Sequence, residues 1–321
     1  MNASGQPPRL LVIDSIRPAI DRTQAMLFGP VLLGMWLRFG FLAFLEGLVR
    51  GGSTTQINFP GTGGPPADMG ESFQEVLDES LAFLAAYALI IVAVLVLLAA
   101  LGIGLRYLGC RAEVSFAYAC AAGTPSLRAD WRRTRSAGNS LFGFHLILLG
   151  LAFAMLLVFG LLIAAAILNR HEMAAALPWL VAAGLFAVFG TMAFGLVDSL
   201  TRQFVTPIMV RDEQGWRAAW GKVGPVLLAN WFPLAGYYLL KVAFWITVGI
   251  ATMLVGCATL CIGLLPIVHH ALFAPVYVFE RNWSMVMLHY LGPDFEVFHA
   301  AEAEPEPASD APWAPVRDDE P

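Results

Sequence analysis

The stretch that decides the fold is residues 81–105, which read LAFLAAYALIIVAVLVLLAALGIGL and contain no charged side chain. At a rise of about 1.5 Å per residue, about twenty such residues cross the roughly 30 Å hydrocarbon core of a bilayer. The whole chain has this character, since 58% of its 321 residues are apolar and 13% are charged. A soluble domain cannot hide so much apolar surface. The composition therefore predicts an all-α integral membrane protein. It excludes a soluble enzyme, a nucleic-acid-binding protein and a disordered scaffold.

Similar apolar stretches predict six transmembrane helices. The first stretch is interrupted only by Arg38 and Glu46, and the run from Val223 to Phe279 contains a single charge, Lys241. That run is too long for one span, so we divide it at a turn near Val255. The expected spans, within a membrane domain over residues 1–292, are 26–49, 81–105, 141–168, 173–197, 226–252 and 258–280.

Lys and Arg are distributed unequally between the two sides of these spans. If the N-terminus is cytoplasmic, fifteen of them lie in cytoplasmic segments, and only Arg50 and Arg170 lie outside. Cytoplasmic loops of membrane proteins carry such an excess. The distribution therefore predicts a multi-pass protein with both termini in the cytoplasm.

Two long polar segments flank the spans. The expected outer loop, 50–80, begins rich in Gly and Pro and then becomes acidic, with Phe73, Val76 and Leu77 on one helical face. We expect a short helix there. The tail, 293–321, has nine acidic residues and one basic residue, so its formal net charge is −8 and that of the remainder of the chain is +3. Its composition predicts disorder, and its charge makes it a candidate arm for binding another protein.

Three basic segments, which begin at Ile16, Leu127 and Trp216, resemble one another and precede the odd-numbered spans. Their aligned cations and their aromatic residues are Arg17, Arg128 and Arg217; Arg22, Arg133 and Lys222; and Trp131 and Trp220. We expect each segment to lie at the cytoplasmic interface, with its cations toward the headgroups. The pattern predicts three repeats of an amphipathic interfacial helix plus a helical hairpin. One alternative is a duplication of the last two units only. The simpler alternative is that any loop between two spans is basic and amphipathic.

Four polar residues are candidates for a site within the membrane: Arg38, Lys241, Asp198 and His269. A charge at the bilayer centre costs at least about 2.5–3.5 kcal/mol. Arg38 is expected about 18 Å along the first span, near that centre. In one interpretation Arg38 and Lys241 line a cavity for an anionic group such as a phospholipid headgroup. In the other they are snorkelled or locally hydrated and only fix helix rotation. Asp198 is expected at the inner surface, and His269 is expected to face the bundle.

No metal ion, cofactor or catalytic group is expected. Cys257 and Cys261 share a helix face, but His269 lies about 12 Å further along the helix, too far to share one metal ion with them. The sequence contains no phosphate-binding loop, nucleophile elbow, zinc-protease motif or dinucleotide fingerprint.

One segment is similar to a recurring segment of bacterial polytopic proteins. It comprises Phe204 to Val210, a polar turn from Arg211 to Gly215, and Trp216 to Trp220. With its hydropathy layout over about residues 112–290, the chain resembles the membrane domain that precedes the catalytic domain of some glycerophosphodiester phosphodiesterases, and the stand-alone relatives of that domain. The resemblance implies an uncharacterised multispan domain of the bacterial cytoplasmic (inner) membrane. It does not imply phosphodiesterase activity, because the sequence has no soluble segment long enough for the catalytic domain.

These observations favour a non-enzymatic membrane protein that organises, senses or assembles components of the cell envelope, with membrane lipids as its partners. The alternative is a transporter or lipid-handling protein with an anion site near Arg38 and Lys241. A membrane-embedded enzyme is a third hypothesis, which no motif supports.

Overall fold

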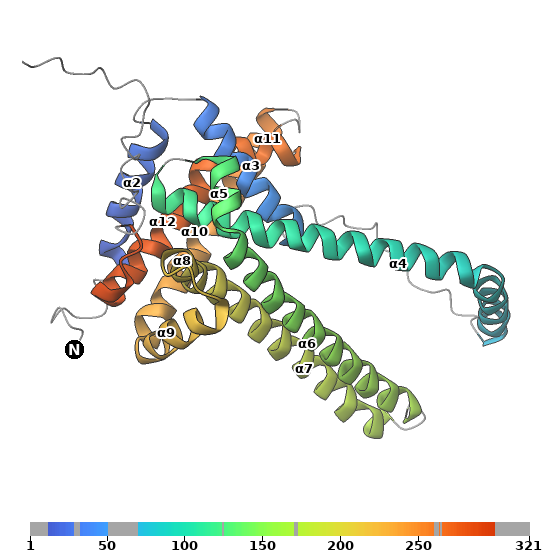
Figure 1. The fold of residues 1–321 in the computed structure, drawn as a ribbon. Coiled ribbons are helices and arrows are strands. Elements are labelled where there is room, and N and C mark those ends of the chain that lie inside the picture. Colours follow the sequence, from blue (N-terminus) through green and yellow to red (C-terminus); the bar gives the residue numbers. More distant parts are fainter. Residues whose placement is uncertain are drawn as a thin grey trace, which may run out of the picture.

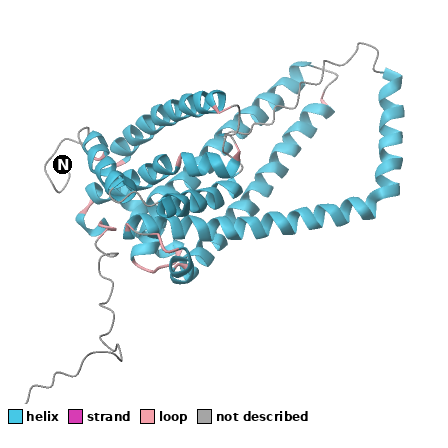
Figure 2. Cartoon of the chain, turned by 90° about the horizontal axis from the view of Figure 1, so that it is seen from above, coloured by secondary structure: helices cyan, strands magenta, loops and turns pink. Residues whose placement is uncertain are grey.

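The structure, a computed structural model, describes residues 12–28, 33–50, 70–123, 125–169, 173–259, 263 and 265–298. Every regular element in these residues is helical, as the composition predicts (Figure 2). In chain order the elements are α2 (Ile16–Phe28), α3 (Leu33–Arg50), α4 (Gly70–Ala122), α5 (Leu127–Arg133), α6 (Arg135–Leu168), α7 (Met173–Leu200), the π-helix η1 (Thr201–Val205), α8 (Thr206–Arg211), α9 (Trp216–Ala229), α10 (Trp231–Ala258), α11 (Pro266–Leu272), α12 (Ala274–Leu291) and the 3-10 turn η3 (Pro293–Phe295).

Four helical stretches among the described residues are long and apolar enough to cross a membrane. They are Tyr87–Ala122, Arg135–Leu168, Ala174–Arg211 and Trp231–Ala258. Many of their large apolar side chains, such as Leu97, Phe153 and Phe189, are exposed. So much exposed apolar surface is stable only against lipid or a partner. These four apolar helices therefore indicate a membrane protein.

The long helices extend from a compact helical core. α6 and α7 run side by side away from this core, and α4 leaves it in a different direction (Figure 1). The core is built from α2, α3, the last part of α4, η1, α8 and α12, with further residues from α6, α9 and α10. Its largest fully buried side chains include Trp283, Arg281 and Tyr237. α4 ends in the core at Gly123, whose φ of +77° is the left-handed conformation in which helices often end.

Two of the expected spans are not single helices. The span over 26–49 is divided between α2 and α3, and residues 29–32 lie outside the described part of the chain. The span over 258–280 is divided between α11 and α12, which meet at Phe273. Prolines begin both of these helices, Pro266 in α11 and Pro275 in α12. Proline suits the first turn of a helix because it has no N–H to donate.

Of the other four expected spans, three lie within longer helices and one is also divided between two helices. α4, α6 and α7 contain the expected spans 81–105, 141–168 and 173–197, whereas the expected span 226–252 begins in α9 and continues in α10. The acidic part of the expected outer loop is helical, because α4 already begins at Gly70. Residues 299–321, which form most of the acidic tail, lie outside the described part, so its disorder and its protein partner stay predictions.

The three basic segments bury equivalent positions. Counted from the starts aligned in the sequence, the buried residues are Ala19, Asp130 and Ala219; Thr23, Thr134 and Val223; and Leu27, Gly138 and Leu227. Thr23 and Thr134 also make the same local bond, since each hydroxyl donates to the carbonyl four residues earlier at 2.7 Å. Each segment therefore presents the same face to the core.

The helices of these segments also have equivalent neighbours. α5 packs on α4, α9 packs on α8, and α2 packs on α12. In two of these contacts a threonine bonds the neighbouring helix: Thr134 to Ser115 at 2.9 Å, and Thr23 to Asn282 at 3.0 Å. α5 and α9 thus each pack on the helix that precedes them in the chain, and α2 packs on the last long helix, α12.

α3 and α11 approach closely at a glycine, which gives a first testable prediction. A Cβ on Gly40 would lie 2.8 Å from the Cα of Ala271, whereas one on Gly34 would meet nothing within 4 Å. Overpacking of a close contact costs about 1–3 kcal/mol. We expect Gly40→Ala to lower the free energy of unfolding by that amount, measured by thermal unfolding in detergent. Gly34→Ala is the matched control on the same helix, and an equal effect of both variants would contradict the close approach.

Candidate functional site

Five charged side chains from four helical elements meet inside the core. We call them the central ion cluster: Glu46 of α3, Arg202 of η1, Lys241 of α10, and Glu280 and Arg281 of α12. Glu46 lies 2.6 Å from Nε of Arg202 and 3.1 Å from Nη2 of Arg281. Glu280 lies 2.8 Å from Nζ of Lys241 and 3.5 Å from Nη2 of Arg202. Each carboxylate therefore joins two cations.

Neutral polar groups extend the cluster. The Gln203 amide donates to Glu280 at 2.9 Å, and the Tyr237 hydroxyl donates to the Gln203 carbonyl oxygen at 3.3 Å. Arg281 also donates to the backbone carbonyl of Arg202. Buried charges are tolerated when they are paired and hydrogen-bonded in this way. The cluster thus links α3, η1, α10 and α12 into one body.

The π-helix helps to position these groups. Pro207 has no N–H, so it interrupts the regular helical bonding directly after η1. The Thr201 carbonyl accepts from both the backbone N–H and the hydroxyl of Thr206, the hydroxyl at 3.0 Å. π-turns of this kind are frequent at functional sites. Here the turn connects α7 to α8 and buries Gln203 against α12.

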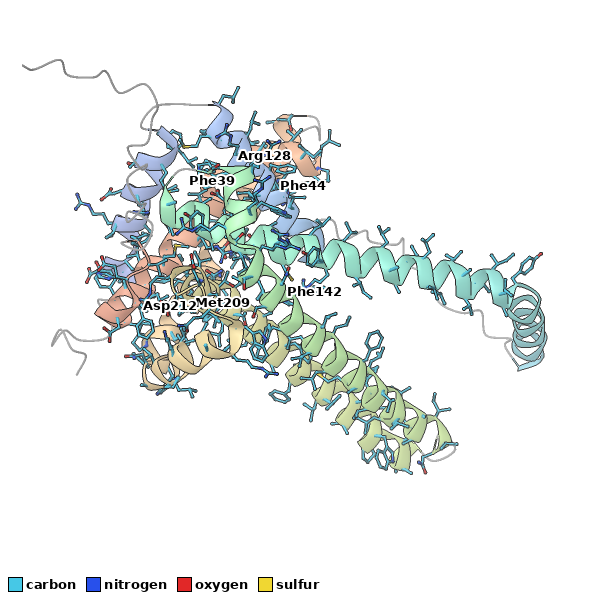
Figure 3. All side chains as sticks on the ribbon, viewed as in Figure 1. Phe39, Phe44, Arg128, Phe142, Met209 and Asp212 are labelled. Carbon is cyan, nitrogen blue, oxygen red and sulfur yellow. The ribbon has the colours of Figure 1, made fainter. Side chains whose placement is uncertain are left out.

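A second constellation lies between α4, α6 and α7. These helices enclose a groove of about 670 Å³. Phe142, which is labelled in Figure 3 on α6, is one of its lining residues. The lining is mostly apolar, but one end carries three polar side chains: Arg106, His145 and Asp198. Asp198 lies 3.1 Å from Nε2 of His145 and 3.7 Å from the Arg106 guanidinium. We call this feature the polar-ended groove.

The groove continues along the α6–α7 hairpin. A smaller cavity of about 280 Å³ is lined only by apolar residues and Thr191, and it shares Ala152 and Phe194 with the groove. From His145 to Phe159 the two cavities follow about 20 Å of helix. The track therefore begins at polar side chains and runs into the apolar part of the hairpin.

The polar end also contains the atoms of a nucleophile–base–acid relay. Cys110 Sγ lies 3.3 Å from Nδ1 of His145, whose other ring nitrogen faces Asp198. A relay of this geometry activates catalytic thiols in other proteins. Here the Cys110 side chain is only 2% exposed and does not line the groove. Nδ1 also lies 3.0 Å from the Leu141 carbonyl. The thiol is sealed away from any ligand in the groove, so we interpret it as a support that positions His145.

The structure separates the two cations expected to share an anion site. Lys241 is buried and paired with Glu280. Arg38 is exposed, and its guanidinium donates to the Pro125 carbonyl at 3.2 Å, beside the start of α5. Arg38 thus lies level with the end of α4 and not halfway along a span. The contacts that the structure shows do not support an anion site shared by Arg38 and Lys241.

The other two membrane candidates lie in different places. Asp198 belongs to the polar-ended groove. His269 is buried in α11, where its Nε2 lies 3.3 Å from the Tyr277 hydroxyl. Cys257 is exposed, and Cys261 lies outside the described residues. Within the described ranges no three His, Cys, Asp or Glu side chains gather as a metal ion would require.

The interfacial residues divide into two groups. Arg17, Arg128 and Arg217 are exposed, as the expected headgroup contact requires. The second cation of each segment instead contacts an end of a neighbouring helix: Arg22 donates to the Cys120 and Ala121 carbonyls, Arg133 lies 3.6 Å from Glu213, and Lys222 lies 2.7 Å from Asp212. Trp131 stacks under the Arg111 guanidinium, and Trp220 packs against the core.

Asp212, labelled in Figure 3 beside α8, accepts hydrogen bonds from two cations. Burial alone would raise the pKa of its carboxyl group, but the bonds from Lys222 and Arg211 outweigh burial and lower the pKa below its ordinary value. The turn between α8 and α9 is thus held by ion pairs at physiological pH.

Sequence reasoning missed most of the partners in both constellations. It named Lys241 and Asp198 but not Arg202, Glu280, Arg106 or His145 as parts of a site. A usable signal was present, because a buried charge needs an opposite charge. Each lone cation in an apolar stretch therefore predicts a carboxylate in another apolar stretch, but it does not identify which residue carries that carboxylate.

Comparison with known proteins gives one match. A family model described as "Family of unknown function (DUF7544)" matches residues 10–298. No curated protein and no solved structure matches the chain. Neither result connects the chain with the phosphodiesterase-associated membrane domain that residues 204–220 resemble.

Proposed function

Because the chain belongs to the DUF7544 family, whose function is unknown, we propose its function from its own geometry. It is a non-enzymatic protein of the bacterial cytoplasmic membrane that binds and organises lipid at the cell envelope through the polar-ended groove. The observation that carries this proposal is the composition of the groove, polar at Arg106, His145 and Asp198 and apolar elsewhere. Ligand pockets of about 300–1,000 Å³ commonly combine an apolar lining with a few polar groups. An amphiphile with a headgroup and an acyl chain matches that division.

The proposed topology places the polar end of the groove at headgroup depth. The basic connections after α4 and α8 favour a cytoplasmic position for the core. α2 lies beside the end of α4, as the Arg22 bonds to Cys120 and Ala121 show, whereas Tyr87 begins the same span at its far end. The chain must therefore cross once between α2 and Tyr87. It must likewise return between Ala258 and α12, whose Asn282 bonds Thr23. These connections support six crossings with both termini cytoplasmic.

We also propose that the chain consists of three repeats, each a short interfacial helix followed by a helical hairpin. The shared buried positions and the packing of α2 on α12, α5 on α4 and α9 on α8 support this proposal. The central ion cluster draws on all three units, with Glu46 from the first, Arg202 from the second and Glu280 from the third. In this arrangement the cluster joins the three units, and the groove lies between the α4 arm and the α6–α7 hairpin.

Blocking the groove tests the function. Gly102 lines the groove, Gly104 does not, and a Cβ on either would meet nothing within 4 Å. We expect Gly102→Trp to remove a lipid that the wild-type protein retains through mild detergent extraction, measured by native mass spectrometry. Gly104→Trp adds the same side chain to the same helix and should keep that lipid. Equal retention in both variants, or a wild-type protein without retained lipid, would contradict the proposal.

A further inference from the structure

We propose that the polar-ended groove selects a zwitterionic phosphoethanolamine headgroup over an anionic one. This inference rests on the proposed lipid-binding function and adds the class of lipid. Its basis is a cation and an anion presented side by side: Arg106 and Asp198 lie 3.7 Å apart, and their side chains are 30% and 29% exposed. Both charges can therefore contact a ligand.

Arg106 provides the phosphate contact. Its ion pair with Asp198 is longer than a hydrogen bond, which for nitrogen and oxygen is about 2.7–3.2 Å. Guanidinium N–H groups thus stay available to a phosphate, which arginine binds in a bidentate manner. The apolar side chains of Leu146 and Leu149 begin the lining directly beyond this point, where the acyl chain of the same lipid would follow.

Asp198 provides the discrimination. Its Oδ1 faces Nε2 of His145, which fixes the carboxylate at the groove. Cys110 and the Leu141 carbonyl in turn contact Nδ1 of the same ring. A carboxylate has about four acceptor positions, so it can also receive the ammonium group of phosphoethanolamine. A headgroup with a phosphate and hydroxyl groups only would place like charges beside each other, which disfavours the wrong ligand.

The depth of the pair agrees with a headgroup site. Asp198 lies near the end of α7, and Arg106 lies in the last part of α4, close to the core. Ala99 lines the groove about 10 Å from Arg106 along α4, and Phe153 lines it about 12 Å from His145 along α6. The ligand therefore has its charged part at the core end of the spans and its apolar part along the hairpin.

The test is competition between two lipids. The full-length protein is reconstituted in vesicles of equal phosphatidylethanolamine and phosphatidylglycerol, extracted mildly, and its retained lipid identified by native mass spectrometry. We expect the wild-type protein to prefer phosphatidylethanolamine by about tenfold, the ratio that one modest charge contact gives. Asp198→Asn keeps the side-chain shape and should abolish the preference by admitting phosphatidylglycerol. Arg106→Gln should reduce retention of both lipids.

Asp212→Asn is the matched control, because it removes the same charge outside the groove and should keep the preference. Retained lipid without a preference in the wild-type protein, or an unchanged preference in Asp198→Asn, would overturn the selection and leave the lipid-binding function standing. Loss of all retained lipid from the wild-type protein would overturn both. Each variant should also unfold at the midpoint temperature of the wild-type protein. A change in the retained lipid then reflects the groove and not a loss of the fold.

Discussion

Replacing Glu280 with glutamine should destabilise the protein by about 3–5 kcal/mol, the cost of leaving buried charges without their partner. Glu280 is 1% exposed and pairs with both Lys241 and Arg202. Glutamine keeps the volume and removes the charge, so both cations stay buried with less compensation. The midpoint of thermal unfolding in detergent measures the effect, and it should fall markedly relative to wild type.

The control for this variant is a carboxylate at the surface. Glu213 pairs with Arg133, but its side chain is 71% exposed, and exposed pairs contribute only about 0–1 kcal/mol. Glu213→Gln should therefore leave the midpoint nearly unchanged. Arg202 keeps its contact with Glu46 in this variant, whereas Lys241 loses the carboxylate of Glu280. Adding Lys241→Met to Glu280→Gln removes this second cation and should restore part of the stability. If Glu280→Gln unfolds no earlier than Glu213→Gln, the central ion cluster does not hold the helices together.

Local sequence predicts the long helices but not the pairing between them. The uncharged run at 81–105 decides that α4 is apolar and helical before any contact is considered. Lys241 and Glu280, in contrast, become neighbours only when α10 packs beside α12. Their spacing along the chain contains no helical or strand period that would reveal the contact. The cluster is thus a tertiary property, and the sequence shows only that each charge needs a partner.

The misplacement of Arg38 has a local cause. Counting about 18 Å from Met26 assumes one continuous helix, whereas α2 ends at Phe28 and α3 begins at Leu33. α2 and α3 run in different directions (Figure 1), so a count from Met26 along one helix axis does not place Arg38, which instead donates to the Pro125 carbonyl. The same error joined α11 to α12 across Phe273. An apolar run predicts burial in the membrane or the core, but it does not by itself establish continuity.

The junction of the first and last helices depends on one tryptophan. Trp283 of α12 is 2% exposed, and its indole N–H donates to the Ser15 hydroxyl at 2.9 Å. Its ring lies 4.8 Å from that of Tyr237 and 5.8 Å from that of Phe279. We expect Trp283→Ala to lower the free energy of unfolding by about 3–5 kcal/mol, since it removes a large buried ring and leaves a cavity.

Two further variants separate packing from hydrogen bonding at this junction. Ser15→Ala removes the hydroxyl that accepts from Trp283 and donates to the Val12 carbonyl. It should cost about 1–3 kcal/mol, because it leaves the buried indole N–H of Trp283 unpaired. Trp231→Ala removes the same side chain from a position that is 67% exposed on α10, so it should cost little. The thermal midpoint should therefore be highest for Trp231→Ala, lower for Ser15→Ala and lowest for Trp283→Ala. A Trp283→Ala midpoint as high as that of Trp231→Ala would mean that α12 does not close the helical core against α2, and it would remove the contact on which the threefold arrangement depends.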